Sequence, residues 1–410
     1  GLKEVVKKQR NKNLFFSCDI KNAISEADMV FISVNTPTKK KGLGAGYASD
    51  LKWVESSARE VAKYSKGHTI VVEKSTVPVR TSELIKEILE GVSKNETGKN
   101  EKSFAVLSSP EFLAEGTAIK DLENPDRVLI GGDDINAINQ LSKIYENWIP
   151  KYKILLTNVW SSELSKLTAN AFLAQRVTSI NSISALCEPT GAEIKEVASA
   201  IGYDSRIGDK FLSAGPGFGG SCFQKDILNL VYLCRYYGLK EVANYWEQVI
   251  TLNNWQRRRI SNLIIEKFYG SVSLKKILIL GFAFKANTND TRESSAISIS
   301  KDLIENGAQL IIHDPQVKPK QIEYEMGQEI NDSSTEGGWQ FSKDIYESAI
   351  DADALVILTE WETYNNIDWE KLFKIMRRPA WIFDTRNIVP KKKVEILGFK
   401  FWGLGKSVIN

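Results

Sequence analysis

Histidine and cysteine are scarce in this chain of 410 residues, and their scarcity excludes several kinds of site. The only histidines are His68 and His313, which argues against histidine acid–base or metal chemistry. The four cysteines lie far apart and form no CxxC pair: Cys18, Cys187, Cys222 and Cys234. The sequence therefore predicts neither a zinc site nor a disulfide framework, and a reducing cytoplasm is the expected compartment.

Long apolar runs and an excess of one charge are absent as well. No stretch approaches the roughly 20 apolar residues of a membrane span, and no signal peptide is visible. The net charge of +3 predicts neither a nucleic-acid nor a membrane-surface partner. With 42% apolar and 26% charged residues, the composition is typical of a globular protein, and the length allows two or three domains.

Within the first predicted α/β domain the sequence also lacks the glycine pattern GxGxxG that binds dinucleotides. The nearest match, "GLGAGY" (42–47), has no glycine at the sixth position and is followed by "ASD". It is either a pyrophosphate loop or a flexible loop, and the second interpretation is favoured. The chain starts at Gly1 with a helical pattern, so we expect it to begin inside a domain whose first strand and glycine turn are missing.

What the sequence does contain is an alternation of short apolar strands and amphipathic helices. Strands are predicted at 29–34, 68–76, 103–111 and 127–132, with a helix at 50–65 whose apolar residues recur every three to four positions. This alternation is typical of a doubly wound parallel sheet, which binds ligands at the carboxyl ends of its strands. The polar residues at those ends are Asn35, Thr36, Ser75, Thr76 and Glu111.

The middle of the chain changes character, because helical spacing without a strand extends from about 160 to 201. Its first helix exceeds 25 residues and either joins two domains, forms a dimer, or lies buried in a bundle. Strands then return at 275–284, 308–315, 352–361 and 379–387, where the loop with Lys285 and Arg292 suits a phosphate. We therefore predict two Rossmann-like α/β domains joined by a long central helix, with boundaries 1–158, 159–262 and 263–410 and the first domain truncated.

The stretch "GPGFGGSCFQKD" (215–226) carries the strongest chemical signal. Glycines let backbone amides approach a ligand, and a helix beginning near Ser221 would place Cys222 in its first turn, where the dipole favours a thiolate. A thiolate adds to an aldehyde, and the carboxylate of Asp226, one turn later, could activate water against the thioester. The alternative is a small buried cysteine beside a tight turn, and the spacing alone does not separate the two.

Two further pairs lie four residues apart, as neighbours on a helix do. Lys166 and Asn170 could stabilise a developing alkoxide, although a solvated helix position explains Lys166 equally well. Glu111 and Glu115 could bind a ligand or could simply be acidic residues favoured at a helix N-terminus.

Seven motifs together resemble the nucleotide-sugar dehydrogenase family over nearly the whole chain, in the form of its eukaryotic-type members that act on UDP-glucose. They are "FISVNTPT", "EKSTVPVR", "PEFLAEGTAIKDL", "NPDRVLIGGD", "WSSELSKLTANAFLAQR", "GFGGSCFQKD" and "LGFAFKANTNDTRESSAISIS". The resemblance implies a two-step oxidation of the C6 alcohol of UDP-glucose to the carboxylate of UDP-glucuronate, with two NAD consumed and no aldehyde released. It also implies self-association into dimers or hexamers.

The same resemblance implies a role for each matched residue. Cys222 would form the thiohemiacetal and the thioester, and Asp226 would position or activate the hydrolytic water. The oxyanion would be stabilised by Lys166 and Asn170, and the catalytic water network would be held by Thr76 and Glu111. NAD would contact Val34, Asn35, Thr36, Thr38, Ser75, Glu115, Lys225 and Arg292. The substrate would contact Phe112, Leu113, Ala114, Phe211, Leu212, Gly215, Phe218, Gly219, Lys285, Arg386 and, from a neighbouring subunit, Arg206.

Two alternatives to this function stay open on the sequence. A dehydrogenase of UDP-N-acetylmannosamine or GDP-mannose would share the Cys, Lys and Asp chemistry. A non-catalytic fragment that binds a nucleotide sugar would account for the missing GxGxxG. No metal is expected in any of these cases.

Overall fold

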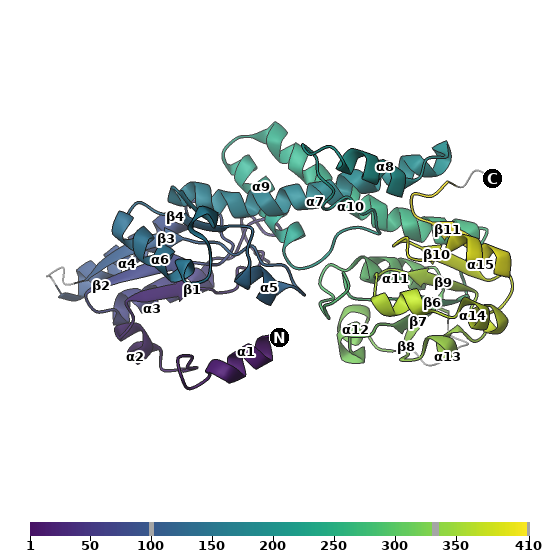
Figure 1. Ribbon diagram of the computed structural model, residues 1–410, viewed down its shortest axis with the longest axis horizontal. Helices are drawn as coiled ribbons and strands as arrows, with labels where there is room; N and C mark the ends of the chain where they lie inside the picture. The colour runs from purple at the N-terminus through teal and green to yellow at the C-terminus, as the bar shows by residue number, and fades with distance from the viewer. Residues whose placement is uncertain (98–101, 330–335, 408–410) are drawn as a thin grey trace. The chain divides into compact units, whose positions relative to one another are not determined.

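The computed structural model describes residues 1–97, 102–329 and 336–407, and the chain divides into two compact units. The first unit comprises Gly1–Asn170 and Lys225–Asn244, and the second comprises Ala171–Gln224 and Tyr245–Asn410. Each unit contains one β-sheet with helices packed against it (Figure 1). This confirms the predicted pair of α/β domains.

The first sheet has the strand order β1-β2-β3-β4-β5. Its strands are β1 (Met29–Ile32), β2 (His68–Glu73), β3 (Ser103–Ser108), β4 (Val128–Gly131) and β5 (Ile154–Thr157). The first three strands are parallel to one another, as are the last two. β3 and β4 meet in an antiparallel contact between Ser108 and Gly131, a detail that the sequence pattern did not predict.

Helices cover both faces of this sheet. The helices that pack on the sheet are α3 (Lys52–Tyr64), α4 (Thr81–Thr97) and α6 (Ile135–Glu146). The unit also contains α1 (Leu2–Gln9), α2 (Ile20–Ser25), α5 (Ala118–Glu123) and a 3₁₀ turn at Lys151–Lys153. Successive side chains of a strand point to opposite faces, so Val71 packs in the core with α3 and α4, whereas Ile70 and Val72 pack in the core with α6. The predicted stripe of α3 is buried at Val54 and Ala58, as expected.

The predicted long helix is α7 (Val159–Thr190), 32 residues that run from the first unit into the second. It ends at Thr190, one residue after Pro189, and Gly191 follows with a φ of 83°, a left-handed conformation that glycine adopts without strain. Three further helices follow it: α8 (Ile194–Gly202), α9 (Phe223–Tyr236) and α10 (Lys240–Lys267).

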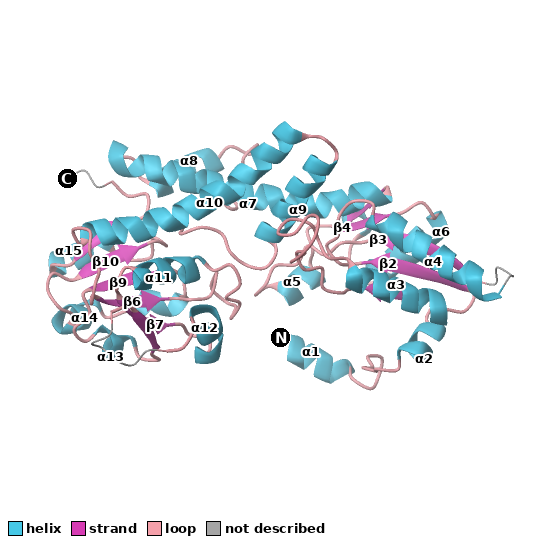
Figure 2. Ribbon diagram, turned by 180° about the vertical axis from the view of Figure 1, so that it is seen from behind, coloured by secondary structure: helices cyan, strands magenta, loops and turns pink. Residues whose placement is uncertain are grey.

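The second sheet has the order β11-β10-β9-β6-β7-β8, and every neighbouring pair is parallel. Its strands are β6 (Lys276–Leu280), β7 (Gln309–His313), β8 (Gly338–Phe341), β9 (Ala354–Ile357), β10 (Trp381–Asp384) and β11 (Lys400–Gly403). Its helices are α11 (Ser295–Glu305), α12 (Pro319–Met326), α13 (Ile345–Ala349), α14 (Trp369–Ile375) and α15 (Lys391–Leu397), with a 3₁₀ turn at Glu362–Asn366. Figure 2 shows these helices flanking the strands.

The centre of the second sheet explains why its strands read as continuous apolar runs. Every residue of β9, and Ile277–Leu280 of β6, has no solvent-exposed surface. A strand that is covered by helices on both faces cannot place polar side chains on either face. The polar residues are therefore confined to the strand ends and the loops that follow them.

Candidate active site

The polar residues predicted from the first sheet gather where its parallel strands end. Thr36, after β1, is only 3% exposed, and its hydroxyl donates to the carbonyl oxygen of Thr76, after β2, at 2.8 Å. Lys225, in the first turn of α9, donates to the same hydroxyl at 3.3 Å. Three segments distant in sequence thus meet at one hydroxyl group.

A buried carboxyl group at the end of β2 holds the loop that follows this strand. Glu73, the last residue of β2, is 1% exposed and accepts a hydrogen bond from the backbone N–H of Ser75 at 2.6 Å. Burial raises the pKa of Glu73 to about 8, so the group is protonated and neutral at pH 7. Its other oxygen, Oε2, has no hydrogen-bond partner in the part of the chain that the structure describes.

A second buried glutamate holds the start of α4. Glu163 of α7 is 2% exposed and accepts from the backbone N–H groups of Arg80 and Ser82, both at 2.7 Å. Burial raises the pKa of Glu163, although these hydrogen bonds act in the opposite direction. Its negative charge adds to the rise at Glu73. The loop from Ser75 to Ser82 is therefore fixed at both ends by carboxyl groups.

The predicted catalytic residues of α7 and α9 form a buried chain of hydrogen bonds. Lys166, Asn170 and Asp226 are 8%, 6% and 1% exposed. The Lys166 ammonium donates to Asn170 Oδ1 at 3.5 Å, and Asn170 Nδ2 donates to Asp226 Oδ2 at 2.5 Å. Burial raises the pKa of Asp226, against the opposing charge of Lys225 at 3.9 Å and the hydrogen bond from Asn170. A solvated helix position for Lys166 is thereby excluded.

Glu111, after β3, has both carboxylate oxygens held. Oε1 accepts from the backbone N–H of Phe112 at 2.8 Å, and Oε2 lies 3.0 Å from the ammonium of Lys74. The Phe112 ring in turn lies 3.9 Å from the guanidinium carbon of Arg127 and 5.2 Å from the Lys166 ammonium. Leu113 and Ala114 continue this loop, and Glu115 begins the turn that precedes α5.

The glycine-rich segment lies in the second unit, where amide side chains hold its backbone. Asn181 of α7 accepts from the N–H of Gly215 at 2.8 Å. Asn253 of α10 accepts from the N–H of Phe218 at 2.8 Å and donates to its carbonyl at 3.1 Å. A Cβ at Gly219 would lie 2.5 Å from the carbonyl oxygen of Glu293, so no other residue fits at this position without a shift of the backbone.

Cys222 directly precedes α9, which begins at Phe223, two residues later than the start near Ser221 that the sequence predicts, so Cys222 lies just before the first turn and not within it. Its side chain is exposed, and Ser221 Oγ lies 3.5 Å from its sulfur. By contrast, Cys187 and Cys234 are buried. An exposed thiol at a helix N-terminus contradicts the interpretation of Cys222 as a small buried cysteine.

Positively charged residues follow two central strands of the second sheet. Arg386, after β10, donates to the carbonyl of Leu358 at 2.8 Å and pairs with Glu360 at 3.1 Å. A Cβ on Gly215 would lie 3.0 Å from its guanidinium, so Arg386 lies beside the glycine-rich segment. Lys285, after β6, is partly buried, with its ammonium 5.5 Å from the ring of Phe284.

The loop after β6, which carries Lys285, is fixed by Asp314 at the end of β7. One carboxylate oxygen of Asp314 accepts from the backbone N–H groups of Phe282 at 2.7 Å and Ala283 at 3.0 Å. The same oxygen accepts from the indole of Trp361 at 3.1 Å. Asp314 is 5% exposed, so its loss would leave these donors buried without a partner.

The predicted site residues are divided between the two units. The first unit contains Val34, Asn35, Thr36, Thr38, Ser75, Thr76, Glu111, Phe112, Leu113, Ala114, Glu115, Lys166, Asn170, Lys225 and Asp226. The second contains Arg206, Phe211, Leu212, Gly215, Phe218, Gly219, Cys222, Lys285, Arg292 and Arg386. Arg292 belongs to the second unit, whereas the other seven residues predicted to contact NAD belong to the first, and it forms an ion pair with Asp290. Arg206 is exposed and pairs with Asp204.

Several supporting residues escaped the sequence prediction. Glu73 and Lys74 lie inside the quoted motif "EKSTVPVR", so their position next to Ser75 and Thr76 was a signal that could have been used. Tyr145, Asn181 and Asn253 lie on helices far along the chain, and no local pattern marks them.

Two kinds of feature do not occur in residues 1–97, 102–329 and 336–407. No three His, Cys, Asp or Glu side chains cluster as they would around a metal ion. No helix there has the length and apolar character needed to cross a membrane.

Three models of one family match the chain. The UDP-glucose/GDP-mannose dehydrogenase family's NAD binding domain matches residues 1–149, its central domain 160–255 and its UDP binding domain 278–391. Because the NAD binding domain matches from the first residue, the comparison does not support the expectation of a truncated first domain. The predicted boundaries at 158/159 and 262/263 fall between the matched ranges and stay a prediction.

The chain is also similar to curated proteins and to solved structures. It is 55% identical to a UDP-glucose 6-dehydrogenase of Mus musculus, covering 100% of this chain and 83% of that protein. UDP-glucose 6-dehydrogenase 2 of Arabidopsis thaliana is 51% identical, with 100% and 87% covered. The structure of a UDP-glucose dehydrogenase from Pyrobaculum islandicum matches with a TM-score of 0.82 and 28% identity, covering 98% of this chain and 85% of that one.

A UDP-D-ManNAc dehydrogenase structure from Pyrococcus horikoshii matches with a TM-score of 0.79 and 26% identity, covering 99% of this chain and 86% of that one. The fold is therefore shared by enzymes with different sugars, whereas the relatives above 50% identity are named for UDP-glucose. By its three matching domains and these relatives, the chain belongs to the UDP-glucose/GDP-mannose dehydrogenase family and is an NAD-dependent oxidoreductase.

Proposed function

We propose that this protein oxidises the C6 alcohol of UDP-glucose to the carboxylate of UDP-glucuronate in two steps on one bound substrate. The observation that carries the proposal is the buried hydrogen-bonded chain of Lys166, Asn170 and Asp226. Its last member, Asp226, comes four residues after the exposed Cys222 in sequence. Relatives named UDP-glucose 6-dehydrogenase at 51–55% identity support the choice of sugar. They disfavour UDP-N-acetylmannosamine or GDP-mannose as the substrate, and they disfavour a non-catalytic fragment.

In the first step the C6 hydroxyl loses its proton and carbon C6 loses a hydride. NAD, when bound, supplies the oxidising power by accepting the hydride. The ammonium of Lys166 and the amide of Asn170 stabilise the developing oxyanion, and burial strengthens this interaction by excluding water. Glu111 and Thr76 order the water that receives the hydroxyl proton.

In the second step the Cys222 thiolate adds to the aldehyde and forms a thiohemiacetal, which keeps the intermediate on the protein. Loss of the thiohemiacetal hydroxyl proton and of a second hydride from C6, for which a second NAD would be the acceptor, gives a thioester to Cys222. Water then attacks the thioester, the C–S bond breaks, and the thiolate and the carboxylate are released. Asp226 takes a proton from this water, a role that suits a carboxyl group whose pKa is raised by burial.

The strand ends of the first unit have the donors and acceptors that NAD requires. Asn35, Thr36 and Ser75 lie in the loops that follow the parallel strands β1 and β2, at the edge where doubly wound sheets bind nucleotides. The remaining residues that we propose for NAD are Val34, Thr38, Glu115, Lys225 and Arg292. In the second unit, Lys285 and Arg386 supply the positive charge that a diphosphate needs, together with the backbone from Gly215 to Gly219.

We also propose that the protein works as a dimer or a larger assembly in the cytoplasm. Apolar side chains of α7 and α10 in the second unit are exposed, among them Phe172, Leu186 and Trp255. The exposed Arg206 would then reach the substrate of a neighbouring subunit. Light scattering tests the assembly directly, and a monomer at micromolar concentration would contradict it.

The proposal is tested by counting NADH. Purified protein is mixed with excess NAD and limiting UDP-glucose, UDP-N-acetylmannosamine or GDP-mannose. We expect two NADH per UDP-glucose and no sustained NADH formation from the other sugars. One NADH per sugar, with free aldehyde, would refute the two-step mechanism. A preference for another sugar would refute the substrate.

A further inference from the structure

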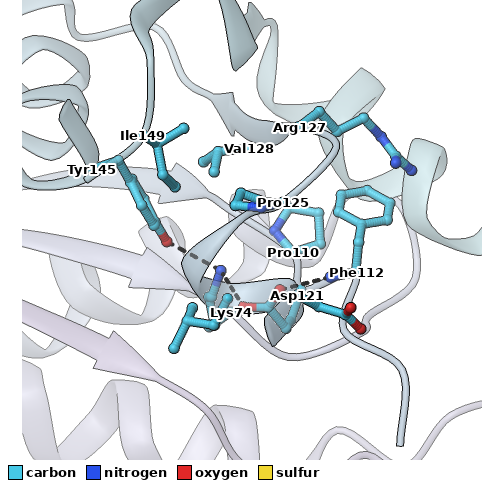
Figure 3. A pocket seen from close by; sticks show the side chains of 11 residues that line it. Lys74, Pro110, Phe112, Asp121, Pro125, Arg127, Val128, Tyr145 and Ile149 are labelled. Atoms are coloured by element: carbon cyan, nitrogen blue, oxygen red, sulfur yellow. Dashed lines mark hydrogen bonds and ion pairs between the residues drawn. The ribbon is translucent and has the colours of Figure 1, made fainter. Parts of the chain in front are cut away.

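Figure 3 shows a recess of the first unit in which Lys74 and Tyr145 point toward each other, and Glu111 also lines this recess. The ammonium of Lys74 lies 3.0 Å from Glu111 Oε2 and donates to the hydroxyl oxygen of Tyr145 at 3.1 Å. Lys74 follows β2, Glu111 follows β3, and Tyr145 belongs to α6. The three residues therefore connect two strand ends of the first sheet to a helix that covers it.

Tyr145 is the fixed end of this link. It is 6% exposed and belongs to the apolar core between α6 and the sheet, and its ring lies 5.5 Å from that of Trp148. Its ring face also attracts the Lys74 ammonium, which lies 5.6 Å from the ring centroid. The Lys74 side chain is 18% exposed, so a flexible lysine is restrained by its contacts with a buried aromatic residue.

Glu111 is the other end of the link, and part of its side chain is exposed to solvent. Its side chain is 36% exposed, although Oε1 is held by the N–H of Phe112 and Oε2 by Lys74. A charge-assisted hydrogen bond of this length is roughly twice as strong as a neutral one. Because the Phe112 ring also contacts Arg127 and Lys166, the segment carrying Glu111 is fixed relative to the predicted oxyanion residue Lys166.

We propose that Lys74, itself fixed by Tyr145, is a positioning residue that holds the Glu111 carboxylate in the orientation needed to order the reacting water. The inference rests on the proposed function for the role of Glu111. A glutamate has several rotatable bonds, and an unrestrained side chain would order water only in a fraction of its rotamers. Lys74 acts through Glu111 and need not touch the substrate.

The test is a double-mutant cycle with steady-state kinetics on UDP-glucose. Lys74→Met is expected to lower kcat about 10- to 100-fold, the range for misplacing a catalytic group, and to change KM less than about threefold. Lys74→Arg, which keeps the charge, restores most of this loss, and Tyr145→Phe gives a smaller loss. In a Glu111→Gln background, Lys74→Met adds less than about a twofold further loss, because the group it positions is already gone.

The matched control is Lys52→Met, which removes an exposed lysine from an ion pair with Asp50 in the same unit and is expected to leave kcat unchanged. Melting temperatures identify variants that fail to fold, and Lys74→Arg and Tyr145→Phe keep the test valid if Lys74→Met is one of them. Two outcomes would overturn the role of Lys74 without affecting the proposed function. One is a Lys74→Met enzyme with wild-type kcat. The other is a Lys74→Met, Glu111→Gln double variant whose loss of kcat equals the product of the two single losses. A wild-type protein that forms no NADH from UDP-glucose overturns the proposed function and the role of Lys74 with it.

Discussion

Replacing Glu73 by glutamine should remove a loss of stability that the wild-type protein suffers as the pH rises. Burial raises the pKa of Glu73 from its ordinary value of 4.5 to about 8. Between these two values the folded protein keeps a proton that the unfolded chain releases. The free energy of unfolding therefore falls with rising pH in this window, and the whole effect of Glu73 is present above pH 8.

The size of the effect follows from the same two values. At about 1.4 kcal/mol per pH unit, the folded protein loses on the order of 5 kcal/mol of stability between pH 4.5 and 8, and about 3 kcal/mol of it by pH 7. Glu73→Gln removes this loss, because an amide keeps the acceptor for the Ser75 N–H and does not ionise. The glutamine side chain also has nearly the same shape as the protonated glutamic acid side chain.

The assay is the melting temperature of wild-type and Glu73→Gln protein from pH 5 to 8.5 at constant ionic strength. The difference between the two should grow in favour of the variant by about 10 °C or more, since 1 kcal/mol is worth roughly 2–4 °C in a domain of this size. Glu87→Gln, on the exposed side of α4, is the control and should show no such trend. A constant difference across the range would refute the conclusion that Glu73 is protonated in the folded state.

Three further changes have expected outcomes. Asp314→Ala leaves buried N–H groups without an acceptor, at about 1–3 kcal/mol each, and should lower the melting temperature and raise KM for UDP-glucose more than it lowers kcat. Gly219→Ala places a Cβ 2.5 Å from the carbonyl oxygen of Glu293, and isothermal calorimetry should show weakened UDP binding. Gly91→Ala meets nothing within 4 Å in α4 and should raise the melting temperature, because alanine stabilises a helix by up to about 1 kcal/mol over glycine; a lower melting temperature would contradict this.

The parts of the fold that sequence reasoning predicted are those with strong local patterns. The strands near 276–280 and 354–357 are continuous apolar runs because helices cover both of their faces. By contrast, β8 (Gly338–Phe341) and β11 (Lys400–Gly403) lie at the two edges of the second sheet and were missed. Each combines two aromatic residues with a glycine and one polar residue and shows no apolar run, so pairing with a neighbouring strand is what makes them strands.

In the candidate site, too, contacts between residues near in sequence could be predicted, whereas contacts between residues far apart in sequence could not. Lys166 and Asn170 could be paired from their helical spacing, and the hydrogen bond between them follows from it. The bond from Asn170 to Asp226 joins residues 56 positions apart, so no spacing rule predicts it. The support of Glu111 by Lys74 and Tyr145 was hidden for the same reason, because the sheet topology alone brings these residues together.

The central claim is that the Cys222 sulfur becomes covalently bonded to C6 of the sugar during the reaction. The most direct measurement is the intact mass of an Asp226→Asn variant after incubation with UDP-glucose and NAD, followed by peptide mapping. With the hydrolytic water no longer activated, the thioester should accumulate as a UDP-glucuronyl adduct on Cys222, and a Cys222→Ala, Asp226→Asn double variant should show none. NADH formation by Asp226→Asn without an adduct on Cys222, or with an adduct on another residue, would contradict the account.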